Sequence, residues 1–100
     1  MIRKGTTPTH IFNTNVDLTE AVALYVTYKQ GGRVVIEKDI SECEVTSTNV
    51  TTKLTQADSL KLNETQTVEM QIRARFSDGT AIASNIMESD AGRVLKGGEI

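Results

Sequence analysis

The sequence predicts an all-β domain folded as an antiparallel β-sandwich. Apolar and polar residues alternate without interruption from Val68 to Phe76, which is typical of a strand with one face in a core and the other in water. Turn-forming residues recur about every 8 to 12 positions, between runs rich in β-branched residues. The chain shows no internal repeat at a solenoid period and no low-complexity tract.

The composition favours one domain with an aliphatic core. At 100 residues we expect a single β-sandwich over residues 9–96, preceded by a flexible arm (residues 1–8) and followed by a frayed end (residues 97–100). The aromatics are two Tyr and two Phe with no Trp, so a stacking platform for bases or sugars is not expected. A single cysteine excludes an intrachain disulfide.

The net charge of −2 argues against a nucleic-acid partner, because such proteins carry a basic stripe. No apolar run approaches the length of a membrane span, so no membrane partner is expected. The N-terminus has no apolar segment after its first charges and therefore does not read as a signal peptide. We expect synthesis in the cytoplasm.

The first predicted strand runs from Thr9 to Thr14, just after the only proline. The sequence leaves open which of Ile11 and Phe12 faces the core. The second strand, Ala21–Lys29, is compatible with a helix in its first half, but its later β-branched and tyrosine residues favour a strand. Its predicted inward residues are Val22, Leu24, Val26 and Tyr28.

Two hairpins are predicted from the requirement that apolar residues of paired strands share one face. For the turn at residues 30–32, a three-residue loop would pair Tyr28 with Val34 and Val26 with Ile36. For the turn at residues 77–79, a three-residue loop ending in a Gly bulge would pair Ala74 with Ile82 and Met70 with Ile86. Ile82 and Ile86 would then lie inward, and burying them is expected to stabilise the fold by roughly 3–6 kcal/mol relative to leaving them exposed.

Two further strands are predicted at residues 42–46 and 49–55, with Cys43 and Val45 facing Thr52 and Val50. Thr55 is expected to cap one helical turn near residues 55–60, with Asp58 as the reciprocal acid and Leu60 turned inward. Residues 81–89 are predicted to form the last long strand, and residues 94–95 a short closing one. About seven strands of this spacing indicate an immunoglobulin-like sandwich.

No catalytic, metal or cofactor site is predicted, and no small-molecule substrate. His10, the only histidine, is interpreted as a half-buried strand residue, and Cys43 as a small core residue. The carboxylates between Glu37 and Glu44 are interpreted as a solvated edge or loop. Arg73 and Arg75 lie side by side on the outward face of the alternating strand. They are compatible with an ordinary solvated sheet face, where arginine is common, or with an interaction patch that Tyr25 could join.

The chain resembles a group of small phage and prophage proteins of Gram-positive bacteria, encoded among tail and baseplate genes. The resemblance covers nearly the whole chain and is carried by four segments and a dipeptide: residues 3–9, 26–30, 54–60 and 71–80, followed by Ala83-Ser84. More loosely, it is similar to the immunoglobulin-like N-terminal domain of phage baseplate upper proteins, without their long C-terminal extension.

This resemblance implies a non-enzymatic structural protein of a phage tail or baseplate. Its partners would be other phage structural proteins or a second copy of itself, through surface complementarity and sheet-edge pairing. It would reside in the virion after synthesis in the host cytoplasm. The alternative is a bacterial surface or carbohydrate-binding β-sandwich module, which would need an exposed aromatic cluster.

Overall fold

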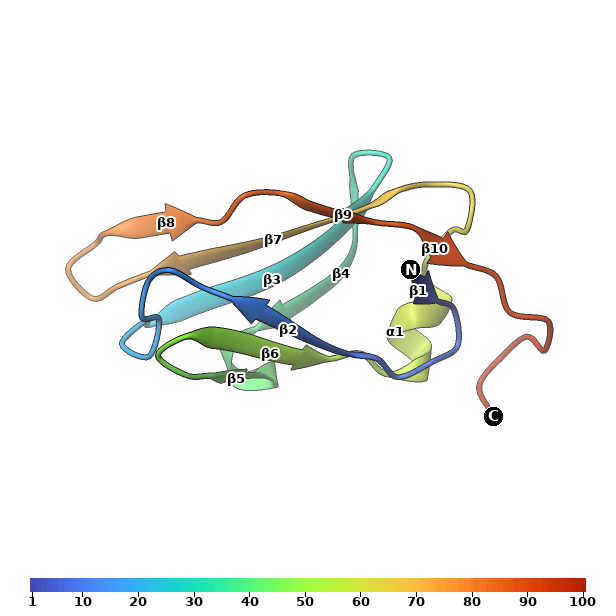
Figure 1. Cartoon of the computed structure of the whole chain (residues 1–100), viewed down its shortest axis with the longest axis horizontal. Helices are drawn as coiled ribbons and strands as arrows, with labels where there is room; N and C mark the ends of the chain where they lie inside the picture. Colours follow the sequence, from blue (N-terminus) through green and yellow to red (C-terminus); the bar gives the residue numbers. More distant parts are fainter.

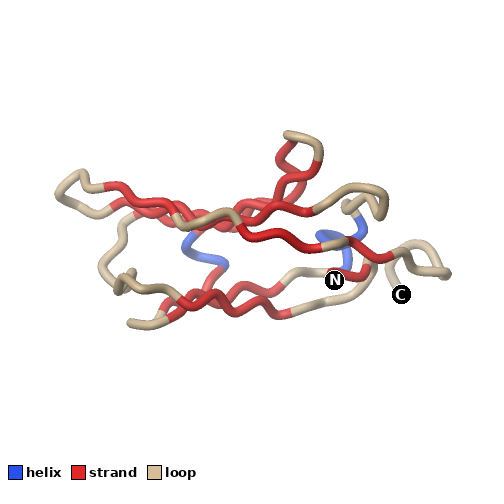
Figure 2. The backbone as a smooth tube through the Cα atoms, turned by 45° about the horizontal axis from the view of Figure 1, so that its top comes forward, coloured by secondary structure: helices blue, strands red, loops and turns tan.

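The computed structural model describes residues 1–100 as two layers of strands, in a body of 47 × 25 × 18 Å (Figures 1 and 2). The elements in chain order are β1 (Ile2–Arg3), β2 (Thr9–Asn13), β3 (Ala23–Gln30), β4 (Arg33–Asp39), the 3-10 turn η1 (Ile40–Glu42), β5 (Cys43–Val45), β6 (Asn49–Lys53), α1 (Gln56–Leu60), β7 (Val68–Arg75), β8 (Ala81–Ala83), β9 (Met87–Ser89) and β10 (Ala91–Gly92).

The larger layer has the strand order β4-β3-β7-β8, with β9 also paired to β7. The smaller layer has the order β2-β6-β5, and η1 crosses from one layer to the other between β4 and β5 (Figure 2). The predicted all-β sandwich with one helical turn is therefore confirmed. The structure has ten strands rather than about seven, because residues 81–89 form two strands and both ends of the chain add a short one.

The core lies between the layers and follows the predicted alternation. In β7 the side chains of Val68, Met70, Ile72 and Ala74 are buried, and in β3 those of Leu24, Val26 and Tyr28. Val22 was predicted to join them but is exposed, because β3 begins only at Ala23. In β2 the structure decides the open question, since Phe12 is buried and Ile11 is exposed.

The hairpin between β3 and β4 differs from the prediction both in its turn and in its register. Gln30 pairs with Arg33, so the loop is the two residues Gly31 and Gly32, whose φ angles of 57° and 77° suit glycine. A bulge between Tyr28 and Lys29 then shifts the register, and Tyr28 pairs with Ile36. The predicted pairs Tyr28–Val34 and Val26–Ile36 are therefore wrong. Val26 pairs with Lys38, and the side chain of Val34 is 56% exposed.

The second hairpin confirms the predicted three-residue loop. Phe76 N donates to Thr80 O at 2.8 Å, Gly79 has a φ of 88°, and Ala74 pairs with Ile82. The prediction that Ile86 faces the core is wrong, since its side chain is 57% exposed and Met87 pairs with Met70 instead. Ser84 still bonds the backbone of Ile72 through its hydroxyl and its N–H, in the register of β8. The register slips by one residue after Ser84, before β9 begins.

The centre of the chain matches the prediction closely. Cys43 pairs with Thr52 and Val45 with Val50. The α1 capping box is formed, with Asp58 N donating to Thr55 Oγ1 at 3.0 Å and Thr55 N donating to Asp58 Oδ2 at 2.8 Å. Leu60 is only half-buried, whereas the small Ser59 is fully buried.

The expectation of a flexible arm at residues 1–8 is wrong, because β1 pairs parallel with β10 and Ile2 is buried. The predicted closing strand at residues 94–95 is also wrong, since Ala91–Gly92 provides that strand and Leu95 is exposed. Residues 97–100, expected to be frayed, belong to no strand, although Ile100 N donates to Gln56 Oε1 at 2.8 Å. No helix has the length and apolar character that a membrane crossing requires.

One charged side chain lies inside the sandwich. Lys38 of β4 pairs with Val26 and is 8% exposed, with Nζ 2.7 Å from Asp58 Oδ2 and 3.5 Å from Glu42 Oε2. Burial acts to lower the pKa of Lys38, but the hydrogen bond and the charge of Asp58, with help from Glu42, raise it overall. Burial likewise opposes ionisation of Asp58, yet hydrogen bonds from Lys38 and Thr55 leave its pKa below the ordinary value.

Candidate functional site

The outer face of the larger sheet brings the predicted interaction residues together. Tyr25 of β3 lies directly opposite Arg73 of β7, and Arg75 follows on the same face of β7. The side chains of all three are exposed, Tyr25 at 46%. We call these residues the outer patch. The alternation of β3 and β7 places it there, because each strand turns every second residue to solvent.

The two arginines of the outer patch are available for a partner. Neither belongs to any of the three ion pairs of the structure. Beyond them, β8 contributes only Ala81 and Ala83 on this side, opposite Arg75 and Arg73. A guanidinium with small neighbours can present its planar set of donors to a carboxylate of another protein, and a half-exposed tyrosine adds apolar area beside it.

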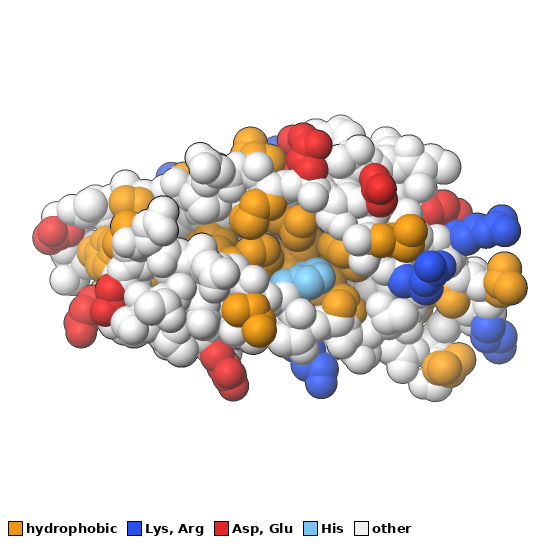
Figure 3. All heavy atoms as spheres, viewed as in Figure 1, with side chains coloured by type: hydrophobic (Ala, Val, Ile, Leu, Met, Phe, Trp, Pro, Cys, Tyr) orange, Lys and Arg blue, Asp and Glu red, His pale blue; other side chains and the backbone are white.

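A second feature is a groove on one open side of the sandwich, between β2 of the smaller sheet and β7, β8 and β9 of the larger one. It has a volume of about 570 Å³. An adjoining hollow of about 400 Å³ continues it past His10 toward Met1. Figure 3 shows hydrophobic side chains gathered in this hollow, with the histidine among them.

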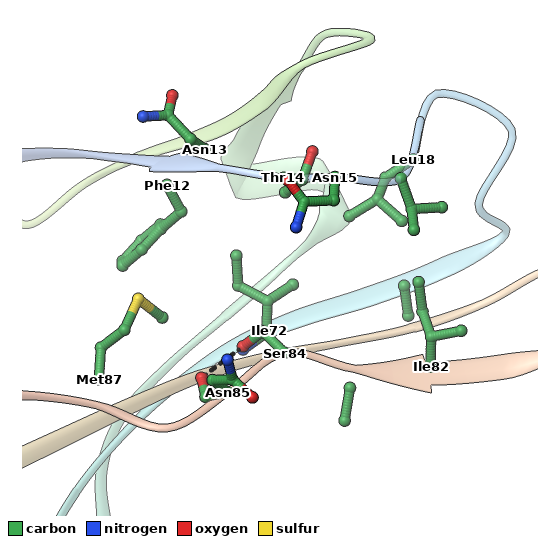
Figure 4. Close-up of a pocket in the computed structure, with 13 residues that line it drawn as sticks. Phe12, Asn13, Thr14, Asn15, Leu18, Ile72, Ile82, Ser84, Asn85 and Met87 are labelled. Carbon is green, nitrogen blue, oxygen red and sulfur yellow. Dashed lines mark hydrogen bonds between the residues drawn. The ribbon is translucent and has the colours of Figure 1, made fainter.

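The groove is apolar at its floor and polar at its rim. Phe12 of β2 and Met87 of β9 point toward one another, and Leu18 and Ile82 lie at the other end (Figure 4). The polar members of the lining are Asn13, Thr14, Asn15, Ser84 and Asn85. The floor can take an apolar side chain, while the rim offers amide and hydroxyl groups to a peptide backbone.

This groove corresponds to none of the features predicted from the sequence. The signal was present in the adjacent pair Ile11 and Phe12, which puts a large apolar residue on each face of β2. The structure buries Phe12 at the groove and leaves Ile11 63% exposed on the other face. The groove is open because the smaller sheet has only three strands and ends at β2, its edge strand on this side.

His10 enters the core from β2 and bonds across the sandwich. Its Nδ1 lies 2.6 Å from the hydroxyl of the fully buried Tyr28. Burial lowers the pKa of His10, with a smaller contribution from the positive N-terminus. Burial also raises the pKa of Tyr28 far above its ordinary value, with smaller effects of Cys43 and Asp58, so the hydroxyl keeps its proton. In the tautomer with its proton on Nε2, the neutral imidazole accepts a hydrogen bond from this hydroxyl at Nδ1.

Stability is expected to fall as the pH drops from 8 to 5.5, because of His10. Its pKa is lower in the folded protein than the 6.5 of an unperturbed histidine, so the unfolded chain binds the proton first. The stabilisation is complete above pH 6.5 and is lost as the pH falls from there toward the pKa of the folded state. Urea unfolding of the wild type and of His10→Gln at both pH values measures it. An equal pH dependence in the two proteins would contradict this role.

Cys43 and the carboxylates between Glu37 and Glu44, the other groups considered from the sequence, lie outside the outer patch and the groove. Cys43 is half-buried beside Thr52, and burial is the main reason that the pKa of its thiol is raised. A raised pKa disfavours the thiolate, which is the nucleophilic form. Among the nearby carboxylates, Glu42 pairs with Lys38. No group of three or more His, Cys, Asp or Glu side chains is placed to hold a metal ion.

Comparison with known proteins identifies no family for this chain. No protein-family model matches the chain, and neither does any curated protein. Among solved structures, the chain is similar to the immunoglobulin-like domain of mouse leukocyte-associated immunoglobulin-like receptor 1, crystallised as a strand-swapped dimer. The TM-score is 0.48 at 18% sequence identity, over 94% of this chain and 85% of that one. The assignment as an all-β sandwich rests on the strand pairing described above.

Proposed function

We propose that this protein is a non-enzymatic structural subunit of a phage or prophage tail or baseplate, acting through protein–protein contacts. The resemblance of the sequence to small tail-region proteins suggests the assembly. The observation that carries the contact role is the outer patch, in which Tyr25 and Arg73 lie opposite one another and both arginines lack an ion-pair partner. Its place would be the virion, after synthesis in the host cytoplasm.

The composition of the outer patch supports this role. Tyrosine and arginine are enriched among the residues that dominate binding energy in interfaces. The patch lies on the central strands β3 and β7, which make the most extensive strand pairing in the structure and hold it rigidly. A rigid site loses little conformational entropy when a partner binds. We expect the partner to present carboxylates to Arg73 and Arg75.

The alternative, a carbohydrate-binding module, has weaker support. Sugar binding of that kind uses neighbouring exposed aromatic rings. Phe12 and Tyr28 are buried and Phe76 is half-buried, which leaves Tyr25 as the one largely exposed ring. We therefore base the experiment on the structural role.

Particles purified from a producing bacterium should contain this chain in a fixed ratio to the tail proteins, as measured by mass spectrometry. The double charge reversal Arg73→Glu, Arg75→Glu should lower its incorporation by about tenfold or more, because like charges would then face each other across the contact. The chain should remain folded, since substitutions at exposed sites usually change the free energy of unfolding by less than about 0.5 kcal/mol.

Arg33→Glu is the matched control, because Arg33 is an exposed arginine beside the Gly31–Gly32 turn, away from the outer patch. It should be incorporated as the wild type is. If particles of wild-type protein contain none of the chain, the structural role is wrong. If the chain is present and the double reversal is incorporated normally, another surface makes the contact.

A further inference from the structure

The edge of β2 has free hydrogen-bonding groups. Leu54 N donates to Pro8 O at 3.0 Å and Thr14 N donates to Thr48 O at 2.9 Å, so the even-numbered residues of this stretch turn their backbone groups toward β6. In an antiparallel pair the intervening residues face away from the partner strand. Thr9, Ile11 and Asn13 therefore present their N–H and C=O groups at the outer edge, where no strand follows.

This edge lacks the features that normally prevent strand addition. Natural edge strands are protected by charges, prolines, bulges or short length. The edge strand β4 contains four charged residues and pairs through a bulge, and β5 is three residues long with Glu44 at its centre. In contrast, β2 is an uncharged five-residue strand with unbroken register and with Ile11 at its centre, 63% exposed.

The edge also borders the apolar groove. Phe12 lines it on the inner face of β2, facing Met87, and His10 lines the adjoining hollow (Figure 4). A strand added beside β2 would bring its own inward side chains over this groove, because neighbouring strands in a sheet share their faces. The incoming strand should therefore be apolar on one face and carry no charge.

We propose that β2 pairs antiparallel with β2 of a second copy, about a two-fold axis at Ile11. The inference rests on the proposed function and names a partner for it. Ile11 would lie opposite Ile11 of the second copy, and Thr9 opposite Asn13 of the second copy. On the inner face, His10 would lie opposite Phe12 of the second copy and add to the cover of the groove.

A second copy of β2 is a better pairing partner for β2 than a charged or irregular segment would be. Self-pairing places no charge against a like charge, since residues 9–13 are Thr, His, Ile, Phe and Asn with a pKa of His10 held below its ordinary value. A two-fold axis makes every contact occur twice. The two three-stranded sheets would join into one of six strands, with no free edge at β2.

Site-specific disulfide formation tests both the pairing and its register, in a Cys43→Ala background that removes the only native thiol. Ile11→Cys should form a covalent dimer on mild oxidation, because hydrogen-bonded antiparallel partners have Cα atoms about 5.5 Å apart, within disulfide range. Thr9→Cys alone should not, because residue 9 of each copy would lie four residues, roughly 13 Å, from its counterpart. Mixing Thr9→Cys with Asn13→Cys should give the heterodimer.

Analytical sedimentation gives a second measurement. An interface made by one pair of five-residue strands is expected to be small, weak and reversible, so the protein concentration should reach about 1 mM. The wild type should rise from 10.9 kDa toward twice that mass. Ile11→Lys should stay monomeric, because two ammonium groups would meet at the axis, and Ile11→Thr should still dimerise.

Equal disulfide yields from Thr9→Cys and Ile11→Cys, or a wild type that stays monomeric, would overturn the pairing. If such a monomer is nevertheless incorporated in particles, the structural role stands and only the β2 pairing fails.

Discussion

Replacing Asp58 by Asn is expected to lower the free energy of unfolding by about 3 kcal/mol, because it leaves a buried ammonium without its nearest anion. Lys38 is 8% exposed and its Nζ lies 2.7 Å from Asp58 Oδ2, whereas Glu42 is farther away at 3.5 Å. Asparagine keeps an oxygen that accepts the Thr55 N–H, so the α1 capping box loses little. Thermal unfolding should show a midpoint lower by about 15 °C.

The double variant Lys38→Met, Asp58→Asn is the control. Methionine has a similar length and no charge, so the core would no longer contain an unpaired ammonium. The double variant should recover about half or more of the stability that Asp58→Asn loses. If it is as unstable as the single variant, the loss comes from the capping of α1 and not from the charge of Lys38.

Replacing Ile72 by Ala should cost about 3 kcal/mol of unfolding free energy, since it removes a buried side chain from the central strand. Ile72 lies on the core face of β7, opposite Val26 of β3, and forms part of the groove floor. The lost packing would widen the groove as well as weaken the core. Urea unfolding monitored by circular dichroism measures the change.

Arg73 provides the comparison because it is the next residue of β7 and points to the opposite face. Arg73→Ala should change the free energy of unfolding by no more than about 0.5 kcal/mol. If the arginine variant were as destabilised as the isoleucine variant, the outer patch would be a structural element of the fold rather than a surface available for a partner.

The sequence was sufficient to predict the strands with an unambiguous alternation and the turns with a fixed chemistry. The alternation of β7 determined which residues lie inside, and the Thr55–Asp58 capping box and the Cys43–Thr52 register followed from local patterns. These features depend on side chains close together in the sequence, where period and spacing are informative.

The errors in register have a different physical origin, because they occur where one inserted residue changes the alternation of a strand. The bulge after Tyr28 and the extra residue between Ser84 and β9 each shift a register by one, so Val34 and Ile86 become exposed. A bulge depends on packing with the opposite layer, which period counting does not contain. Lys38 was missed for the same reason, since an inward lysine is tolerated only when the fold supplies Asp58.

Of the candidate surfaces, the outer patch followed from alternation alone, whereas the groove did not. Tyr25 and Arg73 belong to neighbouring strands, so knowing the outward residues of each was enough to bring them together. The groove depends on how the two layers are offset and on where the smaller sheet stops. Neither property can be read from a single strand; the adjacent pair Ile11 and Phe12 indicates only that β2 carries a large apolar residue on each face.

The parallel pairing of β1 with β10 has a consequence for anything genetically attached to this domain. Ile2 and Ala91 are register partners, and both chain ends emerge at the same pole of the long axis (Figure 1). A tag or reporter fused at either end would therefore sit at that pole, leaving the far tip with the Ser77–Gly79 hairpin unobstructed. A short linker between the ends would close the chain into a ring, from which new termini could be opened at the Gly31–Gly32 turn.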